Sequence, residues 1–261
     1  MGSFTYSELE QAISPGRASR YLGSTVSSVT GPPDPRAAVQ LYERNVEISA
    51  AAWVVISDIE IVLRNIVADS MTAHHATTRT SVNYRWYDDP AWFATGQKWF
   101  TSETLRSIAT AMGRVGDPGP TGAPRPPEGR VVAELTLGFW RYLLVSRYEH
   151  SLWNPSIRSS FHGLSHLSGS DSRKAVYSAV ERLNYLRNRV AHHEPIYEPF
   201  TIPGHPGGPI DARLTLTNAI EMVSWANPAA VQWIERRSTL TRAGRWRHLG
   251  YSARGIARPS L

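Results

Sequence analysis

A short segment late in the chain, Leu186 to Ile196, carries the residue types that a phosphodiester-cleaving site needs. Imidazole gives and accepts protons near neutral pH, and a guanidinium group binds a phosphate through two parallel hydrogen bonds. Together these groups can drive the attack of a ribose 2′-hydroxyl on its own phosphodiester without a metal ion. The candidate residues are Arg187, Asn188, Arg189, His192 and His193.

The spacing of these residues predicts how a helix presents them. At about 100° per residue, Asn188 and His192 share one face of the helix, and Arg189 and His193 share another. Arg187 and His192 point about 140° apart. Arginines followed by histidines are also favoured at a helix C-terminus by the helix dipole, so a solvated helix end is the alternative interpretation and, on geometry alone, the better supported one.

We expect this segment to end an amphipathic helix that spans residues 171–194. Asp171 and Ser172 are both suitable N-caps, and Pro195 prevents the helix from continuing. Between these ends, apolar residues recur at helical spacing and predict a buried face. They are Val176, Val180, Leu183, Leu186 and Val190.

The rest of the chain has the same periodicity. Apolar residues recur at spacings of three and four almost throughout, which predicts an all-α protein, a multi-helix bundle. A long helix is expected over about residues 36–73, broken or bent near residues 49–52. Within it, Glu60 and Arg64 are four residues apart and can form an ion pair along one face. Further helices are expected at 6–13, 15–22, 130–150, 155–161, 212–225 and 228–237.

Three segments depart from the helical pattern. Ser81 to Phe100 is rich in aromatic residues and is expected to pack over the helices as an irregular insertion. Gly113 to Gly129 contains several prolines and glycines, which predict a flexible excursion. The last segment, 241–261, is rich in arginine and is expected to be a flexible tail. We expect one helical domain over residues 1–240 to precede this tail.

Composition limits the classes of site and location. The chain has no cysteine, which excludes disulfides and thiolate metal sites. No zinc-like ligand spacing is present, and the adjacent His74 and His75 are expected to be a solvated pair, so we expect neither a metal ion nor a cofactor. The most apolar stretch, Ile48 to Val67, contains charged residues and predicts a soluble helix rather than a membrane span. No secretory signal is present at the N-terminus, and the expected location is the cytoplasm.

The charge of the chain is consistent with a polyanionic partner. The formal net charge is +6 and the sequence pI about 9.8. Arginine supplies nearly all of the positive charge, because Lys98 and Lys174 are the only lysines. Guanidinium groups match phosphate geometry and stack on bases, which favours RNA as a partner. A GC-rich genome produces the same arginine bias and remains the alternative.

Several elements resemble, in the same order, those of the Abi-like (abortive infection) family, a branch of the HEPN superfamily of helical ribonucleases. Together they extend over about residues 5–240. The opening helices are followed by a Leu-Tyr-x-x-Asn element, a Glu-x-x-Leu-Arg-Asn element, a helix before the motif and the Arg-x4-His motif itself. The segments are Tyr6 to Leu22, Leu41 to Asn45, Glu60 to Asn65, Val132 to Trp140 and Leu186 to Ile196.

This resemblance implies a metal-independent endoribonuclease that acts as a toxin or an abortive-infection effector against phage. His192 is then the general acid/base, Arg187 stabilises the phosphate, and Asn188 orients the imidazole or the substrate. His193 is the reserve acid/base. Arg189 and Arg182 are supporting or substrate-binding residues. A non-catalytic HEPN module that binds RNA or a partner protein is the alternative function.

The resemblance also implies a homodimer, in which each protomer supplies one Arg187 and one His192 to a shared cleft, so that Arg187 of one chain and His192 of the other can face one phosphate. The apolar positions Val176, Val180, Leu183 and Val190 would then be divided between the chain's own core and the dimer interface. Glu60 and Arg64 match family positions, and we interpret them first as a buried structural pair and second as support for the site. RNA is the expected substrate, and an antitoxin RNA or protein is left open as a further partner.

Overall fold

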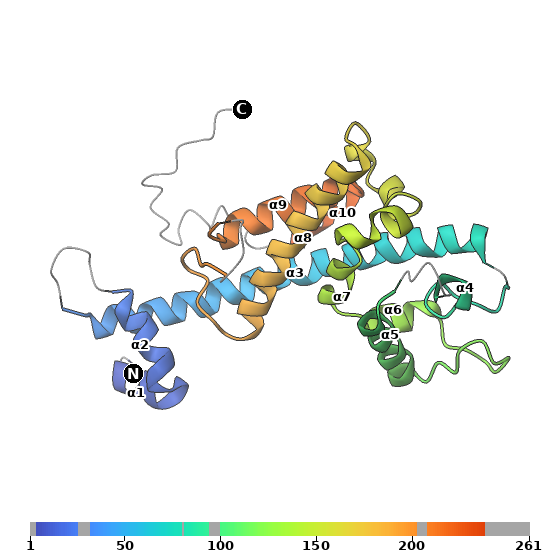
Figure 1. The fold of residues 1–261 in the computed structure, drawn as a ribbon. Coiled ribbons are helices and arrows are strands. Elements are labelled where there is room, and N and C mark those ends of the chain that lie inside the picture. The colour runs from blue at the N-terminus through green and yellow to red at the C-terminus, as the bar shows by residue number, and fades with distance from the viewer. Residues whose placement is uncertain (1–3, 26–31, 80, 94–99, 203–207, 238–261) are drawn as a thin grey trace. The chain divides into compact units, whose positions relative to one another are not determined.

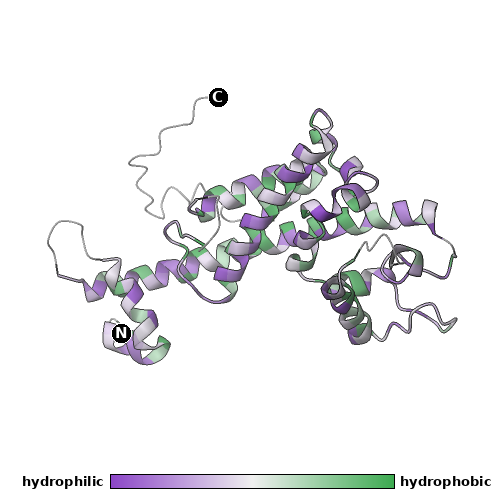
Figure 2. Ribbon diagram, viewed as in Figure 1, coloured by the Kyte–Doolittle hydropathy of each residue, from purple (hydrophilic) through white to green (hydrophobic). Residues whose placement is uncertain are grey.

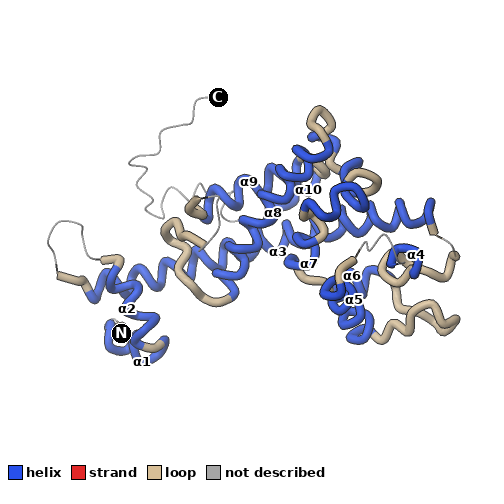
Figure 3. Tube along the Cα trace, in the orientation of Figure 1, coloured by secondary structure: helices blue, strands red, loops and turns tan. Residues whose placement is uncertain are grey.

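The structure is a computed structural model, and it describes residues 4–25, 32–79, 81–93, 100–202 and 208–237. Within these ranges the chain consists of helices joined by loops and contains no β-strand (Figure 3). Phe200 and Ile210 form an isolated antiparallel bridge. The predicted all-α class is confirmed.

Helix α3, Pro35–Thr78, is the longest element and runs without interruption for 44 residues. Asp34 caps its start, because its Oδ1 atom accepts hydrogen bonds from the backbone N–H groups of Arg36 (2.9 Å) and Ala37 (3.2 Å). The break expected near residues 49–52 is absent. Three consecutive alanines follow Ser49, and alanine is the strongest helix former.

The chain divides into two compact units, each assembled from separate stretches of sequence. Unit 1 draws its described residues from the ranges 1–54 and 186–213, and unit 2 from 55–185 and 214–237. Helix α3 and helix α8, Gly169–Ala191, each contribute to both units. A single domain over residues 1–240 stays a prediction, and the tail predicted at 241–261 lies outside the described residues.

Unit 1 begins with two short helices, α1 (Tyr6–Ile13) and α2 (Pro15–Gly23), close to their predicted bounds. A capping box starts α1: Thr5 Oγ1 accepts from the Glu8 N–H (3.3 Å), and the Glu8 carboxylate accepts from the Thr5 N–H (2.6 Å). Figure 1 shows both helices in blue beside the start of α3. A small core of buried Leu9, Ala18 and Val39 joins the three helices.

Unit 2 contains the remaining helices and most of the buried aromatic side chains. Figure 2 shows apolar and polar residues alternating along its helices, as expected of helices with one buried face. Trp86, Tyr87, Trp92 and Phe100 of the aromatic insertion are buried, so its described part belongs to the core. The helices are α4 (Pro90–Phe93), α5 (Ser102–Val115), α6 (Glu128–Glu134), α7 (Leu137–Tyr142), α9 (Ala212–Ser224) and α10 (Pro228–Arg237).

The Pro/Gly-rich excursion of unit 2 is held by a buried carboxylate. Asp117 accepts hydrogen bonds from Arg125 Nε (2.7 Å) and Arg85 Nη1 (3.2 Å), and Arg125 also contacts Asp88. Burial raises the pKa of Asp117, but the hydrogen bonds, chiefly from Arg125, outweigh it and leave the pKa below its usual value. The predicted flexible excursion is therefore anchored at its centre.

Candidate functional site

Helix α8 presents the predicted site residues at its C-terminal end. It begins at Gly169, two residues before the predicted start. Ser168 is the N-cap instead of Asp171 or Ser172: its Oγ accepts from the Asp171 N–H (3.1 Å) and donates to the Asp171 carboxylate (2.8 Å). The helix ends at Ala191, so both histidines follow the last helical residue.

The turn after α8 explains this early end. The His193 N–H donates to the Val190 carbonyl (3.0 Å) and the Glu194 N–H to the Arg189 carbonyl (2.9 Å), which is the Schellman pattern of helix termination. That pattern requires a left-handed residue, and His193 adopts a φ of 55°. A side chain larger than that of glycine disfavours this conformation, so His193 is held in a strained backbone position that sets the direction of its imidazole.

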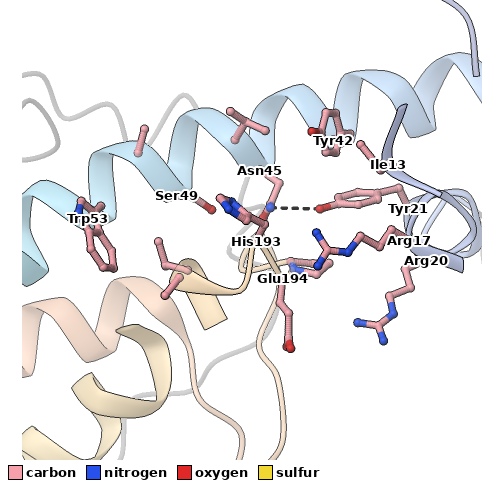
Figure 4. A pocket seen from close by; sticks show the side chains of 15 residues that line it. Ile13, Arg17, Arg20, Tyr21, Tyr42, Asn45, Ser49, Trp53, His193 and Glu194 are labelled. Atoms are coloured by element: carbon pink, nitrogen blue, oxygen red, sulfur yellow. Dashed lines mark hydrogen bonds between the residues drawn. The ribbon is translucent and has the colours of Figure 1, made fainter. Parts of the chain in front are cut away.

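His193 faces a groove that lies entirely within unit 1 (Figure 4). The groove has a volume of about 780 Å³ and lies between α2, the first half of α3 and the turn after α8. His193 lines it, whereas His192 does not. The other lining residues are Ile13, Arg17, Arg20, Tyr21, Tyr42, Asn45, Val46, Ser49, Ala50, Trp53, Val190, Ala191, Glu194 and Pro195.

One buried amide joins the three walls of this groove. Asn45 is 3% exposed, and its Oδ1 atom accepts a 2.7 Å hydrogen bond from the Ile196 N–H. Its Nδ2 atom donates to the Tyr21 hydroxyl at 3.2 Å, and the Tyr42 ring packs edge-on against Tyr21 at 5.4 Å. The predicted Leu-Tyr-x-x-Asn element therefore has a structural explanation: its tyrosine and asparagine hold α2 and the turn after α8 against α3.

Arg187 approaches the groove through an aromatic contact. Its Cζ atom lies 5.4 Å from the centroid of the Trp53 ring, within the range of a cation–π interaction. Its Nε atom is buried and has no hydrogen-bond partner in the described part of the chain. Trp53 is 39% exposed and lines the groove.

Arg189 has a different environment. Its guanidinium donates to the Pro195 carbonyl (3.0 Å), forms an ion pair with Glu194 (3.5 Å) and lies 4.2 Å from the centroid of the Phe200 ring. Burial lowers the pKa of Arg189 from its usual value, with the Glu194 carboxylate opposing this effect. These contacts identify Arg189 as a residue that holds the chain after α8.

Asn188 and His192 are exposed at the end of α8. Among the described residues no hydrogen bond joins their side chains, although the His192 N–H donates to the Asn188 carbonyl at 2.9 Å. The His192 carbonyl accepts from Arg17 Nη2 at 3.4 Å, so α2 contacts the end of α8 directly. The Arg187, Asn188 and His192 assignments stay predictions.

The predicted residues of unit 2 have structural partners. Glu60 Oε1 accepts a hydrogen bond from the Leu137 N–H at the start of α7 (3.1 Å), and the ion pair between Glu60 and Arg64 is present at 3.4 Å. Both side chains are half-buried, which fits the structural interpretation given to them first. Arg182 is half-buried on the unit 2 part of α8 and does not line the groove.

The dimer interface predicted on α8 is wrong in its residues. Val176, Val180 and Leu183 are 0% exposed and Val190 is 6% exposed, so all four are buried within one chain. The recurrence of apolar residues identified a buried face of the helix. It cannot show whether the chain's own helices or a second protomer covers that face.

Three further expectations, on a histidine pair, a metal site and a membrane span, can be compared with the structure. His75 is buried, and its Nε2 atom lies 2.8 Å from Asp89 Oδ2, so its interpretation as part of a solvated pair is wrong. The described ranges contain no group of three or more histidines and carboxylates that could hold a metal ion. No described helix combines the length and apolar character that a membrane span requires.

Sequence reasoning missed the contributions of α2 and α3 to the groove. Arg17 and Arg20 are three residues apart and share one exposed face of α2, which was a usable indication of a basic surface. Along α3, Asn45, Ser49 and Trp53 follow one another at intervals of four and share one face of the helix. Nothing in the sequence indicated that the two sets face each other.

Comparison with known proteins identifies the family. The family model described as Abi-like protein matches residues 33–198, well over half of the chain. The match includes the groove residues on α3 and after α8 but not those on α1 and α2. No curated protein and no solved structure matches the chain. The chain therefore belongs to the Abi-like protein family.

Proposed function

We propose that this protein is a metal-independent endoribonuclease that acts as a toxin or abortive-infection effector. Membership of the Abi-like family suggests an abortive-infection function. One further observation carries the proposal. Within the described residues, the side chains of Arg187, His192 and His193 form no hydrogen bond or ion pair, whereas Arg173 and Arg189 are both paired. The groups suited to phosphodiester chemistry are thus available to a substrate.

The proposed chemistry is an internal transfer within RNA. His192 accepts the proton of a ribose 2′-hydroxyl, and the oxygen attacks the adjacent phosphorus. The bond from phosphorus to the 5′-oxygen breaks, and a second imidazole donates the proton that this oxygen requires. Arg187 stabilises the negative charge that develops on the non-bridging oxygens, and Asn188 orients the imidazole or the substrate. The products are a 2′,3′-cyclic phosphate and a 5′-hydroxyl.

The helix geometry favours a site shared between two protomers. Arg187 and His192 point about 140° apart on one helix, which makes it difficult for both to reach the same phosphate. In a two-fold dimer, Arg187 of one protomer and His192 of the other can act on one phosphodiester. His193 of the protomer that supplies His192 is the second imidazole in this arrangement.

The test is cleavage of end-labelled RNA by the purified protein in excess EDTA. We expect cleavage to continue and to leave cyclic phosphate ends, while the same sequence carrying 2′-O-methyl riboses stays intact. Loss of activity in EDTA, with recovery on addition of a divalent ion, would establish metal-assisted hydrolysis instead. Binding without cleavage under all conditions would favour a non-catalytic RNA-binding module.

A further inference from the structure

We propose that the groove of unit 1 binds a single-stranded segment of the RNA substrate. In this arrangement Arg17 and Arg20 of α2 hold two backbone phosphates, and Trp53 of α3 stacks on a base. The inference rests on the proposed function, because it takes the bound polyanion to be the RNA that the α8 end cleaves. None of the three residues belongs to the Arg-x4-His motif.

The charge of the groove supports phosphate as the ligand. Within the described residues the Arg20 guanidinium has no hydrogen-bond or ion-pair partner. Arg17 gives one long hydrogen bond of 3.4 Å to the His192 carbonyl, which leaves most of its five N–H donors available. The one carboxylate that lines the groove, Glu194, is already paired with Arg189 at 3.5 Å. Two guanidinium groups therefore dominate the electrostatics of this wall.

The opposite end of the groove is suited to binding a nucleobase. Trp53 is 39% exposed, and Arg187 lies near its ring at 5.4 Å. An exposed indole is a stacking surface for an unpaired base. Figure 4 shows Trp53 at one end of the row of lining side chains and Arg20 near the other. A strand whose phosphates meet α2 can thus place a base on α3.

The middle of the groove is suited to a single-stranded nucleotide rather than to a duplex. Bases in a duplex are stacked on each other and cannot reach an indole in a groove between helices. Val46 and Ala50 form apolar walls, and the Ser49 Oγ atom beside them is buried without a hydrogen-bond partner in the described part of the chain. A volume of about 780 Å³ falls in the range of roughly 300–1,000 Å³ that ligand sites occupy.

His193 connects this subsite with the proposed chemistry. Its left-handed backbone directs the imidazole toward α3, and Figure 4 shows it beside Asn45 and Ser49. A strand held by Arg17 and Trp53 therefore passes the end of α8. This path makes Arg17, Arg20 and Trp53 binding residues, whose loss is expected to raise KM and Kd and to leave kcat nearly unchanged.

The test measures binding of a fluorescent 12-nucleotide RNA with 2′-O-methyl riboses, which prevents cleavage during the measurement. The Arg17→Ala, Arg20→Ala double variant is expected to weaken binding about tenfold or more. It is also expected to reduce the slope of log Kd against log salt by about 1.4, because each lost phosphate contact on a single strand contributes about 0.7. The control is the Arg36→Ala, Arg44→Ala double variant, which removes an equal charge from exposed positions of α3 outside the groove. Wild-type affinity and slope in the double variant would overturn the proposal.

A second pair of variants tests the stacking residue. Trp53→Ala is expected to weaken binding about tenfold, and Trp53→Phe to recover much of the loss. The control is Trp233→Ala on α10, since Trp233 is 40% exposed and has an arginine 5.0 Å from its ring but lies outside the groove. If Trp53→Ala instead converts a dimer to monomers in light scattering and leaves RNA affinity unchanged, this face belongs to a second copy and the proposal is wrong.

Failure of this inference differs from failure of the proposed function. Wild-type protein that binds the RNA through Arg17 and Arg20 but never cleaves it would refute the ribonuclease and retain the subsite. Protein that cleaves RNA in EDTA with an unchanged KM in the double variant would refute the subsite and retain the ribonuclease. Circular dichroism of each variant, together with the size-conserving Arg17→Gln and Arg20→Gln changes, separates lost contacts from lost folding.

Discussion

At the scale of single residues, the two adjacent histidines have different structural roles. His192 is exposed just after α8, whereas His193 occupies the left-handed position that ends the helix and lines the groove. A β-carbon in this conformation costs roughly 1–2 kcal/mol, which glycine avoids. The Arg-x4-His spacing predicts His192 as the acid/base, while the groove geometry favours a substrate-contacting role for His193.

Replacement of His193 tests separately its effect on stability, through backbone strain, and its effect on RNA binding. His193→Gly is expected to raise the free energy of unfolding by about 0.5–1 kcal/mol, because the relief of backbone strain exceeds the entropy that glycine adds to the unfolded chain. The same change is expected to weaken RNA binding. His193→Asn, which tolerates the left-handed conformation, serves as a control with a polar side chain. A lower free energy of unfolding for His193→Gly in urea titrations would show that the histidine is not strained.

The sequence predicted the composition of the α8 end but not its geometry. Arg187, Asn188 and His192 follow from residue types and spacing, and Arg189 was grouped with them on the same grounds. In the structure Arg189 binds Pro195, Glu194 and Phe200 instead. Extrapolating a helix to residue 194 could not show this, because the Schellman turn redirects the chain from His193 onward.

At the scale of elements, Asn45 is the residue that makes α2, α3 and the turn after α8 one assembly. Its two hydrogen bonds join residues that lie 24 and 151 positions away in the sequence. Helix positions were predictable because they depend on local periodicity: α1 and α2 match the prediction closely. Contacts between distant elements depend on side-chain pairing, which one sequence does not reveal.

Asn45→Ala is therefore expected to destabilise the protein more than an ordinary surface change. The Ile196 N–H would stay buried without its acceptor, which costs about 1–3 kcal/mol. We expect the free energy of unfolding in urea to fall by about 2 kcal/mol, with a matching loss of RNA affinity as the groove loses its shape. Gln40→Ala removes an amide from an exposed position of the same helix and is expected to be nearly neutral. Equal stability of the two variants would contradict the anchoring role.

At the scale of the whole molecule, the proposed active site requires two protomers. The angle between Arg187 and His192 is the physical reason, and the four apolar α8 residues buried within one chain are not available to the interface. The interface could not be predicted, because apolar periodicity identifies a buried face and not the surface that covers it.

Mixing two inactive variants tests the shared site. Arg187→Ala and His192→Ala proteins are each expected to be inactive, and their mixture is expected to regain part of the wild-type cleavage rate. If subunits exchange at random, about half of the dimers contain one copy of each variant, and each of these has one intact site out of two. The mixture is therefore expected to recover roughly a quarter of the wild-type activity. No recovery after verified exchange of subunits, or full activity from a species that is monomeric in light scattering, would exclude a composite site.

Arg187 and His192 are the residues proposed to cleave RNA, and the most direct measurement of their role is the single-turnover rate of RNA cleavage in EDTA. Compared with wild type, Arg187→Ala and His192→Ala are each expected to lower this rate by about 100-fold or more, with an unchanged helical circular dichroism spectrum. His166→Ala, which removes an exposed imidazole from unit 2, is expected to retain the wild-type rate. Cleavage by both motif variants at the wild-type rate would contradict the account.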